Sequence, residues 1–174
     1  AIGAAAGGGK WQNIVAGAGA GAVAGGAGGY YYANKKERYF NEEERLDAIL
    51  VDMRADNQKL EALVADAHTM ITADNAAIDQ TEHDLAAKRI SLAQARTRMA
   101  AVDDNRAVLE KTIGGLKERR DEWRRTAAEA RRDAGASPKV AEMEREIGTL
   151  ETQVTRLQRE LDQLTTRRRS SVVG

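Results

Sequence analysis

The sequence predicts an all-α protein in three parts: a Gly/Ala-rich helical hairpin, a long coiled-coil helix and a shorter antiparallel return helix. Three observations lead to this fold class. Glycine recurs at every fourth position through a charge-free stretch near the amino end, and apolar residues after it recur in steps of three and four. Aromatic residues make up only 4% of the 174 residues and charged residues 31%. Such a composition is typical of long helices and coiled coils rather than of a thick globular core.

Charge and cysteine content exclude several classes of function. The 27 basic and 27 acidic side chains leave no net charge, which gives no general attraction to nucleic acid or to anionic lipid, and we expect no nucleic-acid partner. The chain has no cysteine. Disulfides, thiol catalysis and thiolate metal sites are therefore excluded together.

The first predicted element covers residues 1–33, which are almost wholly glycine and alanine. Residues four apart lie on one face of a helix, and a groove of glycines there lets another helix approach closely, as in membrane interfaces built from small residues. A helix over residues 13–33 would rise about 30 Å, enough to cross the hydrocarbon core of a bilayer. We expect zipper packing at Gly3, Gly7, Gly17, Gly21, Gly25 and Gly29.

Aromatic and basic side chains flank this stretch, as is typical of the boundary between membrane and water. The expected interface anchors are Trp11, Tyr30, Tyr31, Tyr32, Lys35 and Lys36. Gly-rich helices insert weakly by themselves, so a zipper requires a partner helix. Residues 1–9 would rise only about 13 Å as a helix, and we interpret them as the tail of a longer one.

The layout AIGAAAGGGKWQN followed by IVAGAGAGAVAGGAGGYYYANKKE resembles the two-helix glycine-zipper module of bacterial outer-membrane lipoproteins. The resemblance implies a signal peptide and a lipidated cysteine ahead of this sequence. It also implies the bacterial outer membrane, with the coiled coil facing the periplasm. Members of the family often carry a peptidoglycan-binding domain after the zipper. A coiled coil stands in that place here, so cell-wall binding is not carried over.

The second predicted element is one helix over residues 34–133. From Leu46 to Leu116 apolar positions recur in an unbroken 3–4 repeat, which predicts the seam of a left-handed coiled coil. Residues 103–105 and 114–115 are weak points where a turn could form, but the seam stays in phase across both, which favours a single helix. Polar residues that interrupt such seams often fix register or oligomeric state. These positions are Asn57, Asp74, Lys88 and Arg106.

The third predicted element is a turn over 134–138, a return helix over 139–169 and a tail over 170–174. Gly135 provides a helix stop, and Ser137 and Pro138 suit the start of a new helix. An antiparallel return along residues 104–133 would place Leu116 and Trp123 in the seam, and the arginines at 167–169 near Asp103 and Asp104. The return seam comprises Val140, Met143, Ile147, Leu150, Val154, Leu157, Leu161 and Leu164.

These lengths leave part of the long helix uncovered. About a hundred residues would extend some 150 Å, of which the return helix covers only about 45 Å. A long apolar stripe does not stay exposed to water. We therefore expect the seam from Leu46 to Val102 to pack against other copies or against another protein, and a homo-oligomer is the most economical solution.

No residue pattern points to catalysis. His68 and His83 lie fifteen residues apart without a ligand cluster, and we interpret both as solvated surface side chains. The glycines near Gly17 lack the preceding strand and following acidic residue of a dinucleotide site. The arginines between Lys117 and Arg132 are interpreted as a solvated face with ion pairs, or alternatively as a docking patch for an acidic partner or polysaccharide. The sequence predicts no enzyme, no cofactor and no metal site.

The predicted function is therefore mechanical. The chain would be a structural, self-associating envelope protein whose zipper and coiled coil build or brace a multi-subunit assembly. Its partners would be further copies, membrane lipid, and other envelope or secretion proteins. One alternative is an oligomeric pore or a component of an export conduit. A second is a soluble coiled-coil adaptor whose Gly-rich head is a linker.

Overall fold

The computed structural model describes residues 30–173. This part of the chain folds into α2 (Tyr30–Arg38), α3 (Glu42–Ala86), α4 (Leu92–Ala134) and α5 (Pro138–Ser170). No strand occurs among the described residues, so the predicted all-α fold class is confirmed. The predicted zipper glycines and Trp11 lie outside the described residues.

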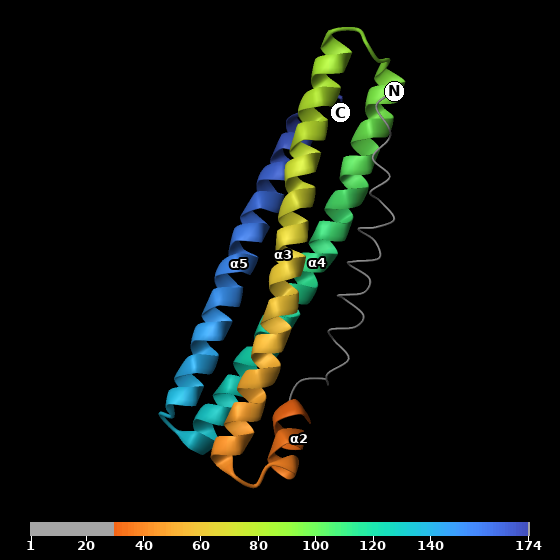
Figure 1. Cartoon of the computed structure of the whole chain (residues 1–174). Coiled ribbons are helices and arrows are strands. Elements are labelled where there is room, and N and C mark those ends of the chain that lie inside the picture. Colours follow the sequence, from red (N-terminus) through yellow and green to blue (C-terminus); the bar gives the residue numbers. More distant parts are fainter. Residues whose placement is uncertain (1–29, 174) are drawn as a thin grey trace.

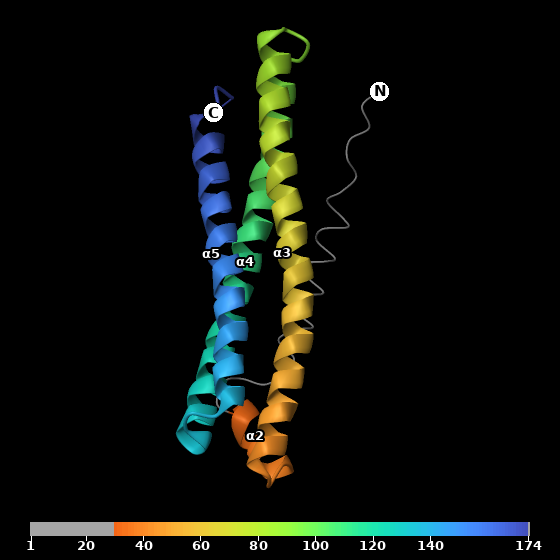
Figure 2. The same cartoon turned by 60° about the vertical axis from the view of Figure 1, so that its left-hand side comes forward.

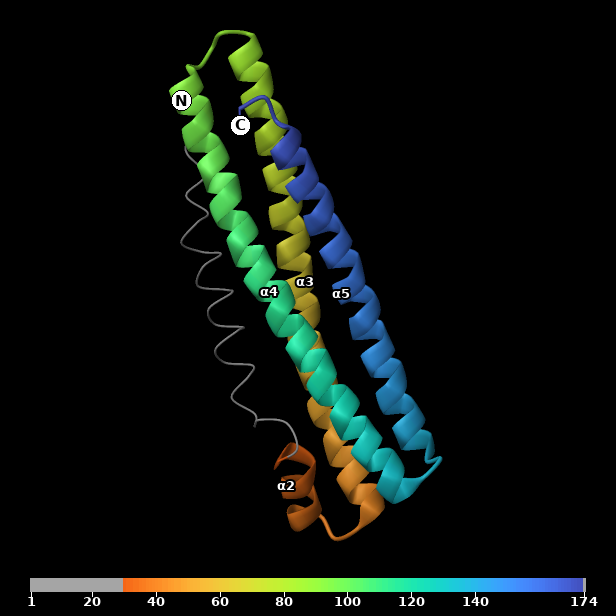
Figure 3. The ribbon, with the colours of Figure 1, turned by 180° about the vertical axis from the view of Figure 1, so that it is seen from behind.

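The three long helices lie side by side in a slender bundle (Figure 1). α3 and α5 run in the same direction and α4 runs against both, and each long helix packs on the other two. The base of the bundle, as we use the term, is the end that carries α2 and the turn between α4 and α5 (Figure 2). The apex is the opposite end, where the α3–α4 loop extends beyond the end of α5 (Figure 3).

At the base, α3 begins where the sequence supplies a strong helix start. The Asn41 side-chain oxygen accepts hydrogen bonds from the backbone N–H groups of Glu43 at 2.9 Å and Glu44 at 3.3 Å. Acidic residues occupy the first three positions of the helix, where they interact favourably with its dipole. This start separates α3 from α2 and makes a short break over residues 39–41.

The predicted single helix over residues 34–133 is wrong, because the chain also reverses at residues 87–91. Lys88 adopts a left-handed backbone conformation with φ of 56°. The Ser91 hydroxyl then accepts the N–H of Gln94 at 3.2 Å, and the Gln94 side chain accepts the N–H of Ser91 at 2.8 Å. This reciprocal capping box starts α4 as a new helix.

The heptad pattern concealed this reversal. Leu85 and Leu92 are seven residues apart, so the seam stays in phase although a loop separates them. In the structure Lys88 is exposed in the loop, and Leu92 is 45% exposed at the first position of α4. α4 itself is helical through residues 103–105 and 114–115, where the sequence suggested weak points.

The chain reversal gives the α3 seam a partner within the same chain. The expectation that the stretch from Leu46 to Val102 lacks an intrachain partner is therefore wrong. Its apolar residues belong to two buried clusters, of which the one nearer the base includes Leu46, Trp123 and Met143. The cluster nearer the apex includes Met99 and Leu161.

The return helix matches the prediction closely. α5 follows Gly135, whose φ is 60°, and Ser137 caps it ahead of Pro138. All eight predicted seam residues of this helix are buried. Leu116 and Trp123 are also buried, at 1% and 2% exposure. None of the helices within residues 30–173 has the length and apolar character to cross a membrane.

Candidate functional site

The most elaborate cluster of polar and aromatic side chains joins α2 to the base of the bundle, and we call it the base clasp. The Tyr31 hydroxyl donates a hydrogen bond to an oxygen of Asp52 at 2.6 Å. The Tyr31 ring meets the Trp123 ring edge to face, with centroids 5.4 Å apart. Lys35 forms an ion pair with Asp52 at 2.8 Å. α2 is thereby fixed to both α3 and α4.

A buried charge pair lies beneath these contacts. Asp56, only 7% exposed, accepts the indole N–H of Trp123 at 3.0 Å and pairs with Arg119. The Arg119 guanidinium carbon lies 4.6 Å from the Trp123 ring centroid and the group also binds Glu122 at 2.6 Å. Because both charges are paired and hydrogen-bonded, the desolvation cost of burying them is compensated.

Tyr32 completes the clasp on its other side. Its hydroxyl donates to Asp133 at 3.2 Å, and Lys36 reaches the same carboxylate at 2.9 Å. The Arg45 guanidinium lies 5.5 Å from the Tyr32 ring centroid. With 5% exposure, Tyr32 cannot lie at a lipid boundary in this arrangement, so its predicted role as an interface anchor is wrong here.

The clasp fixes the protonation of its own groups. Burial and the hydrogen bond to Asp52 raise the pKa of Tyr31 far above its ordinary value, and burial also raises the pKa of Tyr32. Burial works to raise the pKa of Asp52, but the bonds from Lys35 and Tyr31 outweigh it and hold that pKa below its usual range. The phenols therefore remain donors and Asp52 remains charged near neutral pH. This arrangement suits a rigid joint.

The other predicted anchors are placed as follows. Tyr31 is half-buried in the clasp, and Lys35 is also largely covered. Lys36 keeps 59% of its side chain exposed while it binds Asp133. Tyr30 contributes the first residue of α2.

Two of the four predicted register positions lie between helices. Asn57 is 7% exposed and its amide donates to a Glu146 carboxylate oxygen on α5 at 3.0 Å. Asp74 is 4% exposed and accepts from Asn105 on α4 at 2.8 Å, while its second oxygen has no hydrogen-bond partner among the described residues. Burial raises the pKa of Asp74 to about 6. Both residues therefore align helices of one chain.

The other two register positions do not act between helices. Lys88 lies in the exposed loop, so its predicted place in the seam is wrong. Arg106 is half-buried, and its ion pairs are with Asp103 and Glu110 of its own helix, both at 3.6 Å.

The apex contains a polar cluster that the sequence reasoning missed. Asp84 is 7% exposed and accepts from Arg89 and Arg98, each at 2.8 Å, and from Gln80 at 2.8 Å. The bonds from Arg98 and then Arg89 lower the pKa of Asp84 to about 2. These contacts fix the α3–α4 loop to the helices on either side. The capping sequence from Ser91 to Gln94 was the signal that could have revealed the loop.

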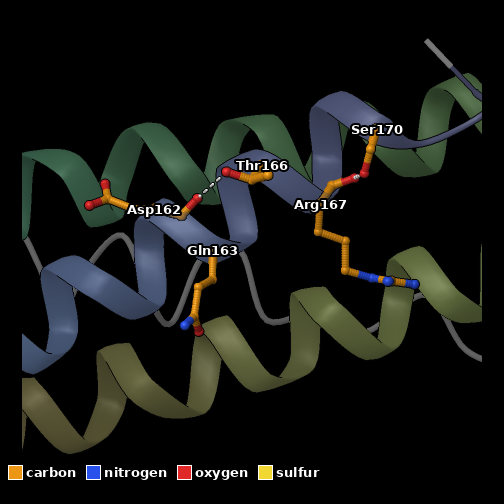
Figure 4. Close-up of a pocket in the computed structure, with 5 residues that line it drawn as sticks. All are labelled: Asp162, Gln163, Thr166, Arg167 and Ser170. Carbon is orange, nitrogen blue, oxygen red and sulfur yellow. Dashed lines mark hydrogen bonds between the residues drawn. The ribbon is translucent and has the colours of Figure 1, made fainter.

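A shallow depression of about 400 Å³ lies along the end of α5 (Figure 4). The hydroxyl groups in it are hydrogen-bonded to the backbone of the same helix. Thr166 donates to the carbonyl of Asp162 and Ser170 donates to that of Arg167, each at 2.9 Å. Arg167 pairs with Asp79 of α3. The side chains in this depression therefore provide no pair of nucleophile and base.

A second depression, of about 250 Å³, includes His68 and Glu160, which lie 2.7 Å apart. Among the residues described, no group of three His, Cys, Asp or Glu side chains could hold a metal ion. The first depression is lined by residues of α5 alone and the second by residues of α3 and α5, and both are open surface features rather than enclosed sites.

The arginine-rich face of α4 forms ion pairs with α5, as one of the sequence interpretations expects. Arg124 binds Glu151 at 2.6 Å and Arg131 binds Glu144 at 2.7 Å. Further along, Arg168 binds Asp103 at 2.9 Å. The predicted approach of the last arginines to Asp103 is confirmed for Arg168, whereas Arg167 pairs with Asp79 of α3 instead.

The chain matches no protein-family model, no curated protein and no solved structure.

Proposed function

We propose that this protein is a structural, self-associating envelope protein. In this proposal the glycine repeat associates with that of other copies in a membrane, and the helical bundle is a rigid rod attached to it. The observation that carries the proposal is the base clasp. α2 begins directly after the glycine repeat, and Tyr31, Lys35 and Tyr32 fix it to α3 and α4. Because α2 is fixed to α3 and α4, the placement that the glycine repeat gives to α2 would also determine the placement of the whole bundle.

The dimensions of the bundle support a spacer. α3 has 45 residues and therefore extends about 67 Å. Its apolar seam is filled by α4 and α5, so the rod needs no second copy to bury it. Self-association then rests on the glycine repeat alone. In this proposal the glycine repeat is responsible for assembly, and the helical bundle is responsible for spacing.

The test is to remove the zipper without disturbing the rod. Gly21→Leu with Gly25→Leu would fill the glycine groove, and we expect the detergent-purified protein to change from an oligomer to a monomer. Native mass spectrometry would give the copy number, and circular dichroism would check that helicity is retained.

Gly114→Leu with Gly148→Leu is the matched control. An added Cβ meets no atom within 4 Å at either position, so this variant should keep the oligomer. A monomeric wild-type protein, or oligomers that survive in the zipper variant, would remove self-association through the glycines from the proposal. Carbonate-resistant association with membranes would separate the proposal from the soluble-adaptor alternative.

A further inference from the structure

The apex concentrates positive charge on a chain whose net charge is zero. From His83 to Arg98 there are four basic side chains and one acidic one, Asp84, which gives +3 with histidine neutral. All other residues together therefore carry −3. This segment comprises the end of α3, the loop and the start of α4.

α5 leaves this end of the bundle uncovered. Near its end Arg167 pairs with Asp79, and Arg168 pairs with Asp103. The tip formed by α3 and α4 extends past that level, as Figures 1 and 3 show. The basic segment is thus the outermost part of the bundle on this side.

Two of the four cations are available to bind a partner. Arg89 and Arg98 are held by Asp84. Lys88 and Arg96 are exposed, and neither forms an ion pair with a carboxylate within residues 30–173. Leu92, 45% exposed, precedes Arg96 by one helical turn, so the two share a face of α4. An apolar side chain therefore lies on the same face as one of the two free cations, Arg96.

We propose that the apex binds an anionic lipid surface, with Lys88 and Arg96 against phosphate groups and Leu92 entering the interfacial layer. The apex is the end of a rod, and it can contact a flat surface whose negative charge is distributed. A peptide ligand would instead need a groove, so the flat surface is the better match. Glu82, directly before this segment, is paired with Arg167 at 3.7 Å. Attraction falls off within about 10 Å at 0.1 M salt, so acidic residues farther along the rod do not cancel it. Asp84 already holds the loop, which reduces the ordering that binding requires.

The site itself does not depend on the glycine repeat. The linking of two membranes does depend on the repeat. If the base is anchored in one membrane as proposed above, apex binding would hold a second lipid surface about 67 Å away. This consequence rests on the proposed function, whereas lipid binding by the apex is tested separately.

The experiment uses the full chain assembled into phosphatidylcholine nanodiscs, with sucrose-loaded vesicles added and pelleted. Gel filtration shows first whether the chain enters the nanodisc, which tests the proposed function. Co-sedimentation then tests the apex. We expect the protein to pellet with vesicles containing phosphatidylglycerol, much less with pure phosphatidylcholine, and less as salt rises.

The decisive variant is Lys88→Glu with Arg96→Glu, which should weaken this binding by about tenfold or more. Lys59→Glu with Arg125→Glu makes the same charge change on exposed sides of the bundle and should alter binding by less than about twofold. Lys88→Gln with Arg96→Gln provides a milder change if charge reversal perturbs folding, which circular dichroism would show.

Three results would overturn the proposal. One is equal binding of the wild type to neutral and anionic vesicles. Another is equal loss in the apex and side variants. The third is apex-dependent binding of polyglutamate without binding to the anionic vesicles, which would assign the site to an acidic polypeptide instead.

Discussion

The base and the apex of the bundle are held together in different ways. At the base, Trp123 and Asp56 are partners 67 residues apart, and Tyr32 reaches Asp133 across 101 residues. At the apex, Asp84 and Arg98 are only 14 residues apart. The base is a tertiary joint made by several elements, whereas the apex is a hairpin stabilised by its own sequence. Stability should therefore be concentrated at the base, and local contacts should let the apex hairpin form early in folding.

The largest expected difference between the two ends comes from truncating buried side chains. Trp123→Ala at the base should lower the free energy of unfolding by about 3–5 kcal/mol, because it leaves a large cavity and removes a partner of Asp56 and Tyr31. Met99→Ala at the apex should cost about 2–3 kcal/mol. Urea denaturation monitored by circular dichroism would compare them. An apex variant as costly as the base variant would contradict the comparison.

The second test separates buried from exposed charge at the base. Asp56→Ala leaves the Arg119 side chain, 13% exposed, without this carboxylate, and should cost about 2–4 kcal/mol. Asp47→Ala is the control, because Asp47 keeps 62% of its side chain exposed in its pair with Lys139 and should cost less than about 1 kcal/mol. Similar losses in the two variants would show that the Asp56 pair does not stabilise the base as argued.

The third test measures how the stability contributed by Asp74, which lies between the two ends, depends on pH. The fold raises the pKa of Asp74 from 3.8 to about 6, so the protonated form is the one the fold favours. Its contribution to stability is complete below about pH 4 and is lost as pH rises through 6. Asp74→Asn should therefore stabilise the protein at pH 8 by about 1–3 kcal/mol and have little effect at pH 4. Urea titrations at both pH values would measure this, and an equal effect at the two would contradict it.

Asp84 should respond to pH in the opposite direction. Its pKa is lowered to about 2 by Arg98 and Arg89, so its contribution is present above pH 4 and is lost as pH falls toward 2. Asp84→Asn therefore serves as the apex control in the same titrations. It should destabilise the protein at pH 8, where Asp74→Asn stabilises it.

The smallest expected effect is at the apex loop. Lys88 has a φ of 56°, a conformation that costs a non-glycine residue about 1 kcal/mol. Lys88→Gly should therefore raise the free energy of unfolding by about 0.5–1 kcal/mol, measured by thermal denaturation. Lys59→Gly in the middle of α3 should lower it by a similar amount, because glycine is unfavourable inside a helix. A destabilised Lys88→Gly variant would mean that the lysine side chain contributes to the loop.

The return helix was predictable because local signals and the seam agree. Gly135, Ser137 and Pro138 give the turn, and the eight apolar positions give the face that α5 buries. The contact of Arg168 with Asp103 then follows from counting residues back along the hairpin.

The reversal at residues 87–91 was not predicted, because the spacing of apolar residues shows whether they share a helix face and not whether the helix between them is continuous. A loop that preserves a spacing of seven between Leu85 and Leu92 is indistinguishable from a helix by that measure. Helix-start chemistry at Ser91 and Gln94 carried the missing information. The role of Tyr32 was not predictable from its neighbours, because an amphipathic aromatic side chain suits both a lipid boundary and a protein surface. Its hydrogen-bond partner, Asp133, is 101 residues away.

Residues 30–173 form three long helices, and this odd number has a mechanical consequence. α3 starts at the base and α5 ends toward the apex. A force that pulls Glu42 and Ser170 apart is therefore directed along the axis of the bundle. Such a load shears the helix interfaces and strains many contacts at once. A bundle with an even number of passes would have both ends on one side and could open one contact at a time. The bundle formed by residues 30–173 should therefore resist a pull along its axis.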